Sequence, residues 1–134
     1  MFSVPILEDL RLKITLTGDE SIRLEGSHGP LTIEAPSYDR AYSPYHMLAS
    51  GLATCTHSVL ASWATHANLK SDGLAIEVAW KFVDGPHRVG EMALTIIWPE
   101  LPKERWAAAE RAAALCPVHH TFKQGPAMSI AARS

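Results

Sequence analysis

The chain has 134 residues, of which 47% are hydrophobic and 19% charged, and its formal net charge is −2. This length suits one compact domain with a substantial core, and the composition excludes disordered, collagen-like and coiled-coil chains. The small net charge does not indicate a basic surface that would bind nucleic acid or an anionic membrane. No apolar run suits a transmembrane helix, and the first residues lack a signal-peptide pattern. We therefore expect one domain over residues 1–134, located in the cytoplasm.

Alternating apolar and polar residues predict three short strands in the first third of the chain. They are LRLKITLT at 10–17, SIRLEG at 21–26 and LTIEA at 31–35. Turn residues separate the three segments, so we expect an antiparallel meander. The following residues, 36–43, show no apolar period and are predicted to form a loop.

A long helix is predicted over residues 45–68, where apolar residues recur at gaps of three and four. Ser43 stands at the expected N-cap and Pro44 at the first helical position. No charged residue occurs in 41–69. A helix so free of charge is buried nearly all round or packs on a partner, and a second copy of the chain is the simplest partner.

The second half alternates between strand and helix patterns. Strands are predicted at 74–83 and 89–98 as a hairpin, followed by a helix at 103–115 and a short helix at 117–123. The segment AMSIAAR at 127–133 is predicted as a last strand. Together these elements indicate an α+β domain built on antiparallel sheet.

The two cysteines are the first candidates for chemistry. Cys55 lies within the apolar stripe of the long helix, where it is either a small buried hydrophobe or a reactive thiol. Cys116 precedes Pro117, at the N-cap position of the short helix, where the amide dipoles favour a thiolate. In a cytoplasmic protein such a pair is free or redox-active more often than a structural disulfide.

A metal site is not expected from the sequence. Cys55 and His57 are two residues apart on a helix and point to different sides, and the chain has no C-x-x-C or H-E-x-x-H motif. It also lacks a glycine-rich phosphate loop and a G-x-S-x-G elbow.

Two segments carry a family resemblance. SPYHMLASGLATCT at 43–56, followed by LCPVHHTF at 115–122, resembles the OsmC/Ohr family of osmotically inducible and organic hydroperoxide resistance proteins, and most closely its OsmC-like branch. The resemblance extends from about Leu10 to Ile130. It implies an intertwined homodimer in which antiparallel β-sheets wrap around central helices, with active sites at the dimer interface.

The resemblance also implies a reaction. Cys55 would be the peroxidatic thiol that attacks a hydroperoxide, and Cys116 would resolve the sulfenic acid to a disulfide that an external dithiol reductant then opens. No metal or organic cofactor would be needed. Family members carry a glutamate just after the motif proline, where this chain has Tyr45 and His46. That glutamate holds an arginine over the reactive thiol.

For that arginine, Arg40 is the first candidate here and Arg23 the second. His46 could replace the glutamate as a hydrogen-bonding partner.

Two other functions stay open at this stage. The chain could be a non-enzymatic dimer that binds a small apolar or acyl ligand. It could also use Cys116 with His119 or His120 as a nucleophile and base in hydrolysis or acyl transfer. The helix-start argument favours Cys116 as the more acidic thiol, whereas the resemblance favours Cys55.

Overall fold

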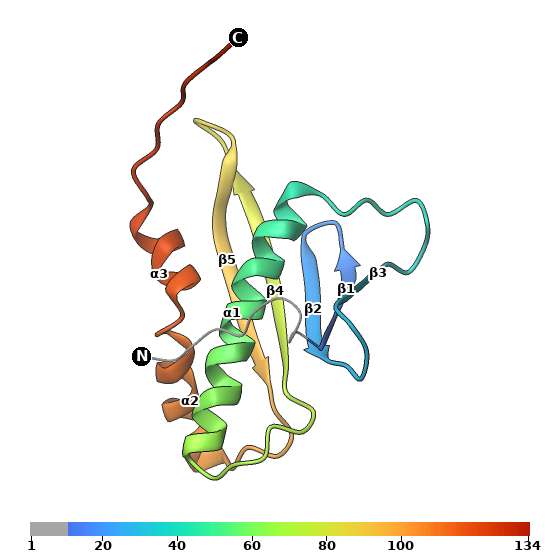
Figure 1. Cartoon of the computed structure of the whole chain (residues 1–134), viewed down its shortest axis with the longest axis vertical. Coiled ribbons are helices and arrows are strands. Elements are labelled where there is room, and N and C mark those ends of the chain that lie inside the picture. The colour runs from blue at the N-terminus through green and yellow to red at the C-terminus, as the bar shows by residue number, and fades with distance from the viewer. Residues whose placement is uncertain (1–10) are drawn as a thin grey trace.

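A five-stranded sheet with one long helix across its face forms the body of the molecule in the computed structural model, which describes residues 11–134 (Figure 1). The strand order is β3-β1-β2-β4-β5. The strands are β1 (Leu12–Gly18), β2 (Ser21–Gly26), β3 (Thr32–Glu34), β4 (Ala75–Val83) and β5 (Arg88–Ile97). The predicted strands therefore form, although the expected start at Leu10 lies outside the described residues.

The prediction of a three-stranded antiparallel meander was wrong in one respect. β3 does not follow β2 as its neighbour but pairs in parallel with β1, on the opposite side of that strand. β4 takes the place beside β2 instead, in antiparallel register. β4 takes this place because it can bury more apolar surface there. β3 has three residues, all exposed, whereas β4 brings a row of buried side chains to the middle of the sheet.

Helix α1 (Pro44–His66) covers one face of the sheet and confirms the predicted helix within two residues at each end. Its start is capped as expected: the Ser43 side chain accepts a hydrogen bond from the His46 backbone N–H, and Pro44 occupies the first turn. Alternate residues of β1, β2 and β4 point at α1 and form the main core with it. The strands contribute Ile22, Leu24, Ile76, Val78 and Trp80 to this core, and α1 contributes Leu60.

Two shorter helices lie beside α1 over the β4–β5 side of the sheet (Figure 1). A 3₁₀ turn (Lys103–Arg105) leads into α2 (Trp106–Ala113), and α3 (Pro117–Gln124) follows it. The final residues, 125–134, form no strand, so the predicted strand at 127–133 was wrong. They run as an extended arm away from the body, and Ile130 is fully exposed. Alternation alone makes no strand unless a neighbouring edge accepts its hydrogen bonds.

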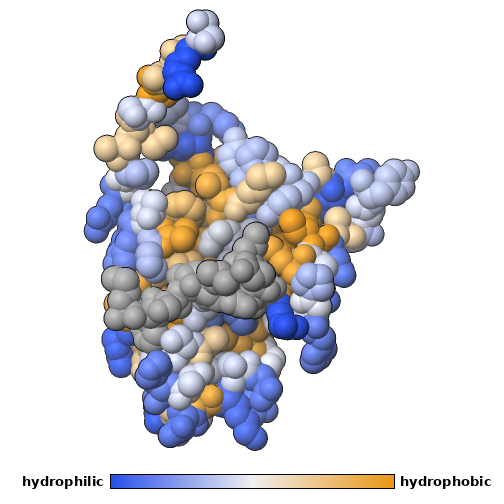
Figure 2. Space-filling view, viewed as in Figure 1, coloured by the Kyte–Doolittle hydropathy of each residue, from blue (hydrophilic) through white to orange (hydrophobic). Residues whose placement is uncertain are grey.

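The face of α1 turned away from the sheet is only partly covered within the described chain. Met47 is 54% exposed and Leu48 44% exposed, and Gly51 lies exposed one turn further on. Figure 2 shows apolar side chains gathered on this side of the molecule within a hydrophilic rim. Among residues 11–134, no helix is both long and apolar enough to cross a membrane.

Candidate functional site

Two thiols meet between α1 and α3. Cys55 lies near the middle of α1, Cys116 immediately precedes α3, and the two side chains lie in one buried cluster, where the Cys116 thiol interacts with that of Cys55. Both are reduced and buried, with 4% of Cys55 and none of Cys116 exposed. They form a small apolar cluster with Leu52 and Val59 that is separate from the main core. The structure thus brings together two residues that are 61 positions apart in the sequence.

The first turn of α3 directs its backbone N–H groups at both sulfur atoms. The His119 N–H donates to Cys116 Sγ over 3.4 Å, and the Val118 N–H interacts with the Cys55 thiol. The sequence expectation that Cys116 caps this helix is therefore confirmed. Because unpaired N–H groups at a helix start carry partial positive charge, this turn favours negative charge on the sulfurs.

The Cys55 thiol is nevertheless neutral near pH 7. Burial is the largest cause that raises its pKa, and the contact with the Cys116 thiol raises it further, to about 11 in total. The Val118 N–H lowers the pKa but does not offset the burial. A thiolate at Cys55 would therefore need a further partner that accepts its proton or balances its charge.

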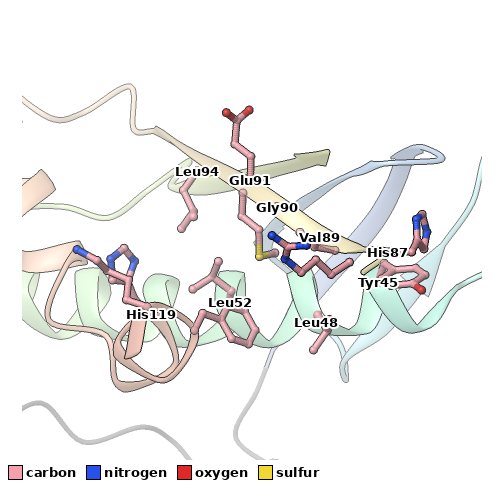
Figure 3. Close-up of a pocket in the computed structure, with 13 residues that line it drawn as sticks. Tyr45, Leu48, Leu52, His87, Val89, Gly90, Glu91, Leu94 and His119 are labelled. Atoms are coloured by element: carbon pink, nitrogen blue, oxygen red, sulfur yellow. The ribbon is translucent and has the colours of Figure 1, made fainter. Parts of the chain in front are cut away.

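A hollow of about 650 Å³ opens beside the cysteine cluster, between α1, β5 and α3. Its lining includes Leu52, which belongs to the cysteine cluster, and Met92 and Leu94, which pack against that cluster. Figure 3 shows Leu52, Leu94 and His119 facing one part of the hollow, with Tyr45 and His87 at its other end. A mainly apolar organic molecule bound there would lie against Leu52, Met92 and Leu94, on one side of the cysteine cluster.

His119 contributes to the site in two ways. Its backbone N–H binds Cys116, while its ring lines the hollow. Partial burial is the main cause that lowers the pKa of the imidazole, and the charges of Lys123 and His120 lower it further. The ring is therefore neutral near pH 7 and able to accept a proton.

The arginines named from the sequence lie away from the thiols in this chain. Arg40 binds Asp19 of the β1–β2 turn, with 2.7 Å between Nη1 and Oδ1. Arg23 lies on the sheet face opposite α1, where it pairs with Glu77 and Glu25. Neither contacts Cys55 in the described structure. A role for Arg40 at the thiol remains a prediction, which requires a different arrangement of the 36–43 loop or a second subunit.

His46 is a structural residue in this chain. Its Nε2 donates to the Gly18 carbonyl over 2.9 Å, and its Nδ1 accepts the Ser43 backbone N–H over 3.2 Å. The ring is buried and packs edge-on against Trp80, with 5.0 Å between ring centroids. The side chain therefore ties the start of α1 to the β1–β2 turn, and it holds no arginine in the described structure.

Sequence reasoning missed the cations that do reach the hollow. Arg88 and Lys123 both line it, and Arg88 Nη1 also donates to the Pro86 carbonyl. Lys123 could have been found, because it stands four residues after His119 on a predicted helix and thus on the same face. Arg88 gave no such signal, since the folding of α3 against β5 decides which side chains surround the hollow.

The structure contains no cofactor-like cluster within the part it describes. Among residues 11–134, no three His, Cys, Asp or Glu side chains are grouped in a way that could hold a metal ion. The candidate site therefore consists of the two thiols, the first turn of α3, the hollow and His119. Together they can carry out thiol redox chemistry on an organic molecule.

Comparison with known proteins points to one family. Residues 37–131 match the family model described as OsmC-like protein. No functionally curated protein matches the chain at a significant level.

Solved structures share the fold. One is a protein of Psychrobacter arcticus 273-4 named for osmotic stress induction and a detoxification response. It is 22% identical with a TM-score of 0.56, over 83% of this chain and 86% of that one. Another is an OsmC-like hydroperoxide resistance protein of Jannaschia sp. CCS1, which is 18% identical with a TM-score of 0.54, over 84% of each chain.

A third is an OsmC-like protein of Mycoplasma pneumoniae, 23% identical with a TM-score of 0.54 over 90% of each chain. At these identities the likeness concerns the mixed α+β fold, with a sheet and helices arranged as in this chain.

Proposed function

The chain belongs to the OsmC-like protein family, and on that premise we propose that it is a thiol peroxidase that reduces organic hydroperoxides. The observation that carries the proposal is the pair of thiols, Cys55 and Cys116, in contact beneath an apolar hollow. One relative of the same fold is named a hydroperoxide resistance protein. A buried thiol pair of this kind supplies both the group that is oxidised and the group that resolves it.

The reaction has two oxidative halves. The Cys55 sulfur attacks the terminal oxygen of the hydroperoxide, the O–O bond breaks, and Cys55 becomes a sulfenic acid while the substrate leaves as its alcohol. The Cys116 thiol then attacks the sulfenic sulfur, a disulfide forms and water is released. An external dithiol exchanges with this disulfide and returns both cysteines to thiols. The cytoplasm, which maintains such dithiols, is the compartment we propose for it.

Contact between the sulfurs favours Cys116 as the resolving residue. The two side chains lie in one buried cluster, so a disulfide would join residues that the fold has already brought together. The Val118 N–H beside Cys55 would also stabilise negative charge on the sulfur as the thiol reacts. Together these contacts make the second step fast relative to further oxidation of the sulfenic acid.

We also propose that the working form is a homodimer. The helix α1 has no charged residue, and its exposed side chains Met47 and Leu48 lie on a face that the other described elements cover only in part. The arm after α3 exposes Met128 and Ile130 in the same way. Burying such surface against a second copy is the common solution for small proteins.

A second candidate function is non-catalytic binding of a small apolar ligand. The raised pKa of Cys55 and the size of the hollow favour it. In that case native mass spectrometry of freshly purified protein would detect a co-purified ligand, and the thiols would be inert to peroxide.

The deciding experiment is intact-protein mass spectrometry. Fully reduced protein receives one equivalent of cumene hydroperoxide and is quenched within seconds with a thiol-alkylating reagent. We expect a mass loss of about 2 Da and no alkylation, because both thiols enter one disulfide. Cumyl alcohol in place of the hydroperoxide is the control and leaves two alkylated thiols.

Single-cysteine variants assign the two roles. Cys116→Ser is expected to accumulate a sulfenic acid at Cys55, which a dimedone-type reagent traps. Cys55→Ser is expected to consume no hydroperoxide. Two free thiols in the wild-type protein after prolonged exposure would overturn the peroxidase proposal and leave ligand binding as the function to test.

A further inference from the structure

The ring of His119 is directed into the hollow and is not held by the rest of the protein. Its backbone N–H donates to Cys116, but the ring makes no hydrogen bond to any of the described residues 11–134. Its one ring neighbour is His120, at 6.1 Å between centroids. A titratable side chain left unpaired in a hollow is free to exchange a proton with a bound molecule.

The position of His119 relative to the thiols is fixed by α3. It follows Val118, whose N–H faces Cys55, and it is the third residue after Cys116. Its ring shares the hollow with Leu52, which packs directly on Cys55. A hydroperoxide that approaches Cys55 from the hollow would therefore share that space with the His119 ring.

The charged and titratable surroundings make His119 the available base. Among residues 11–134, Glu91 is the single carboxylate that lines the hollow, and Figure 3 shows it directed away from the other labelled side chains. Cations, by contrast, hold their protons at neutral pH and cannot accept another. The titratable neighbours of the His119 ring are His120 and Lys123, while Tyr45, His87 and Arg88 line the hollow further away and the two cysteines lie in the adjoining cluster.

We propose that His119 carries the proton in the peroxidase reaction, taking it from the Cys55 thiol and giving it to the alkoxide that leaves. This inference rests on the proposed function and adds to it a catalytic residue outside the cysteine pair. It gives a proton acceptor to a buried thiol beside which no cation lies among residues 11–134.

The step neither gains nor loses a proton overall. The neutral imidazole accepts the thiol proton, and the sulfur bonds to the terminal oxygen, which keeps its own hydrogen and becomes the sulfenic hydroxyl. The O–O bond breaks toward the alkoxide, which takes the proton from the imidazolium and leaves as the alcohol. The imidazole is neutral at the start and at the end, so the step needs no other acid or base.

A leaving-group comparison tests this role. tert-Butyl hydroperoxide releases a strongly basic alkoxide that needs a proton, whereas perbenzoic acid releases benzoate, which does not. The rate of Cys55 oxidation in a single turnover is measured for both oxidants with the full-length reduced protein. His119→Gln keeps the backbone contact to Cys116 and a polar side chain but cannot carry the proton.

We expect His119→Gln to slow tert-butyl hydroperoxide by about 100-fold and perbenzoic acid by about tenfold or less. The ratio of the two rates therefore changes about tenfold, which a merely structural role would not produce. His28→Gln makes the same chemical change in an exposed turn and leaves both rates unaltered.

Three outcomes overturn the inference. If His119→Gln reacts as fast as wild type, or slows both oxidants equally, His119 does not protonate the leaving group while the peroxidase function stands. If the wild-type protein itself reacts with neither oxidant, the proposed function fails and takes this inference with it.

Discussion

Helices α1 and α3 start from the same four-residue pattern, a capping residue, a proline, an apolar residue and a histidine. The sequences are SPYH at 43–46 and CPVH at 116–119. In both, the capping side chain accepts the backbone N–H of the histidine, over 3.2 Å at α1 and 3.4 Å at α3. The two histidine rings then differ, because the ring of His46 folds back on its cap and the ring of His119 lines the hollow.

The surroundings explain the difference. At α1 the last residue of β1 supplies the Gly18 carbonyl and Trp80 supplies a packing surface, so both nitrogens of His46 have hydrogen-bond partners in a buried site. At α3 the capping atom is a sulfur that faces a second sulfur, and the ring opens onto apolar side chains. The same local motif therefore gives a buried, hydrogen-bonded histidine at the start of α1 and an unpaired histidine, available for chemistry, at the start of α3.

The largest expected effect is the difference in protein stability between a variant that lacks the His46 ring and one that lacks the His119 ring. His46→Ala removes a buried ring and its hydrogen bonds to Ser43 and Gly18, so we expect the free energy of unfolding to fall by about 3 kcal/mol. His119→Ala is expected to change it by less than about 0.5 kcal/mol, because its ring is unpaired and partly exposed. Urea unfolding at one fixed protein concentration measures both. Equal losses would mean that His119 is also a structural residue.

The second prediction concerns how the Cys55 thiol makes the stability of the protein depend on pH. Because the folded chain holds the Cys55 proton more tightly than the unfolded chain, this stabilisation is complete below pH 9 and is lost as pH rises to about 11. We expect a decline of about 2 to 3 kcal/mol in the free energy of unfolding across that range. Cys55→Ser lacks this decline under reducing conditions, and an identical decline in the variant would contradict the raised pKa.

A third prediction concerns the Ser43 cap at the start of α1. Ser43→Ala removes the acceptor of the His46 N–H and the hydroxyl beside its ring, so we expect a loss of about 1 kcal/mol in unfolding free energy. Ser129→Ala, in the exposed arm, is the matched control and should have no effect. Thermal or urea unfolding of the three proteins distinguishes a real cap from an incidental contact.

The smallest effect is spectroscopic. Nitrogen NMR should find His46 in one fixed tautomer with the proton on Nε2, because its Nδ1 accepts the Ser43 N–H. His119 should titrate below the ordinary histidine range, and Lys123→Gln should raise its pKa slightly by removing a nearby positive charge. Lys70→Gln, at the other end of α1, is the control. A fixed tautomer at His119 would contradict the unpaired ring.

Local patterns in the sequence predicted most of the secondary structure. Alternation located β1, β2, β4 and β5, and the caps Ser43 and Cys116 marked both helix starts. The two cysteines were named with the motifs around them. These features depend on neighbours within a few residues, so they can be read without knowledge of the fold.

The tertiary structure decided what those elements meet. It placed β3 beside β1, left residues 127–133 without a strand partner, and set Arg40 against Asp19 rather than Cys55. It also turned His46 inward and His119 toward the hollow, and brought Arg88 to its rim. Pairing and side-chain direction follow from competition for buried area and hydrogen-bond partners among residues distant in the chain, which no local pattern encodes.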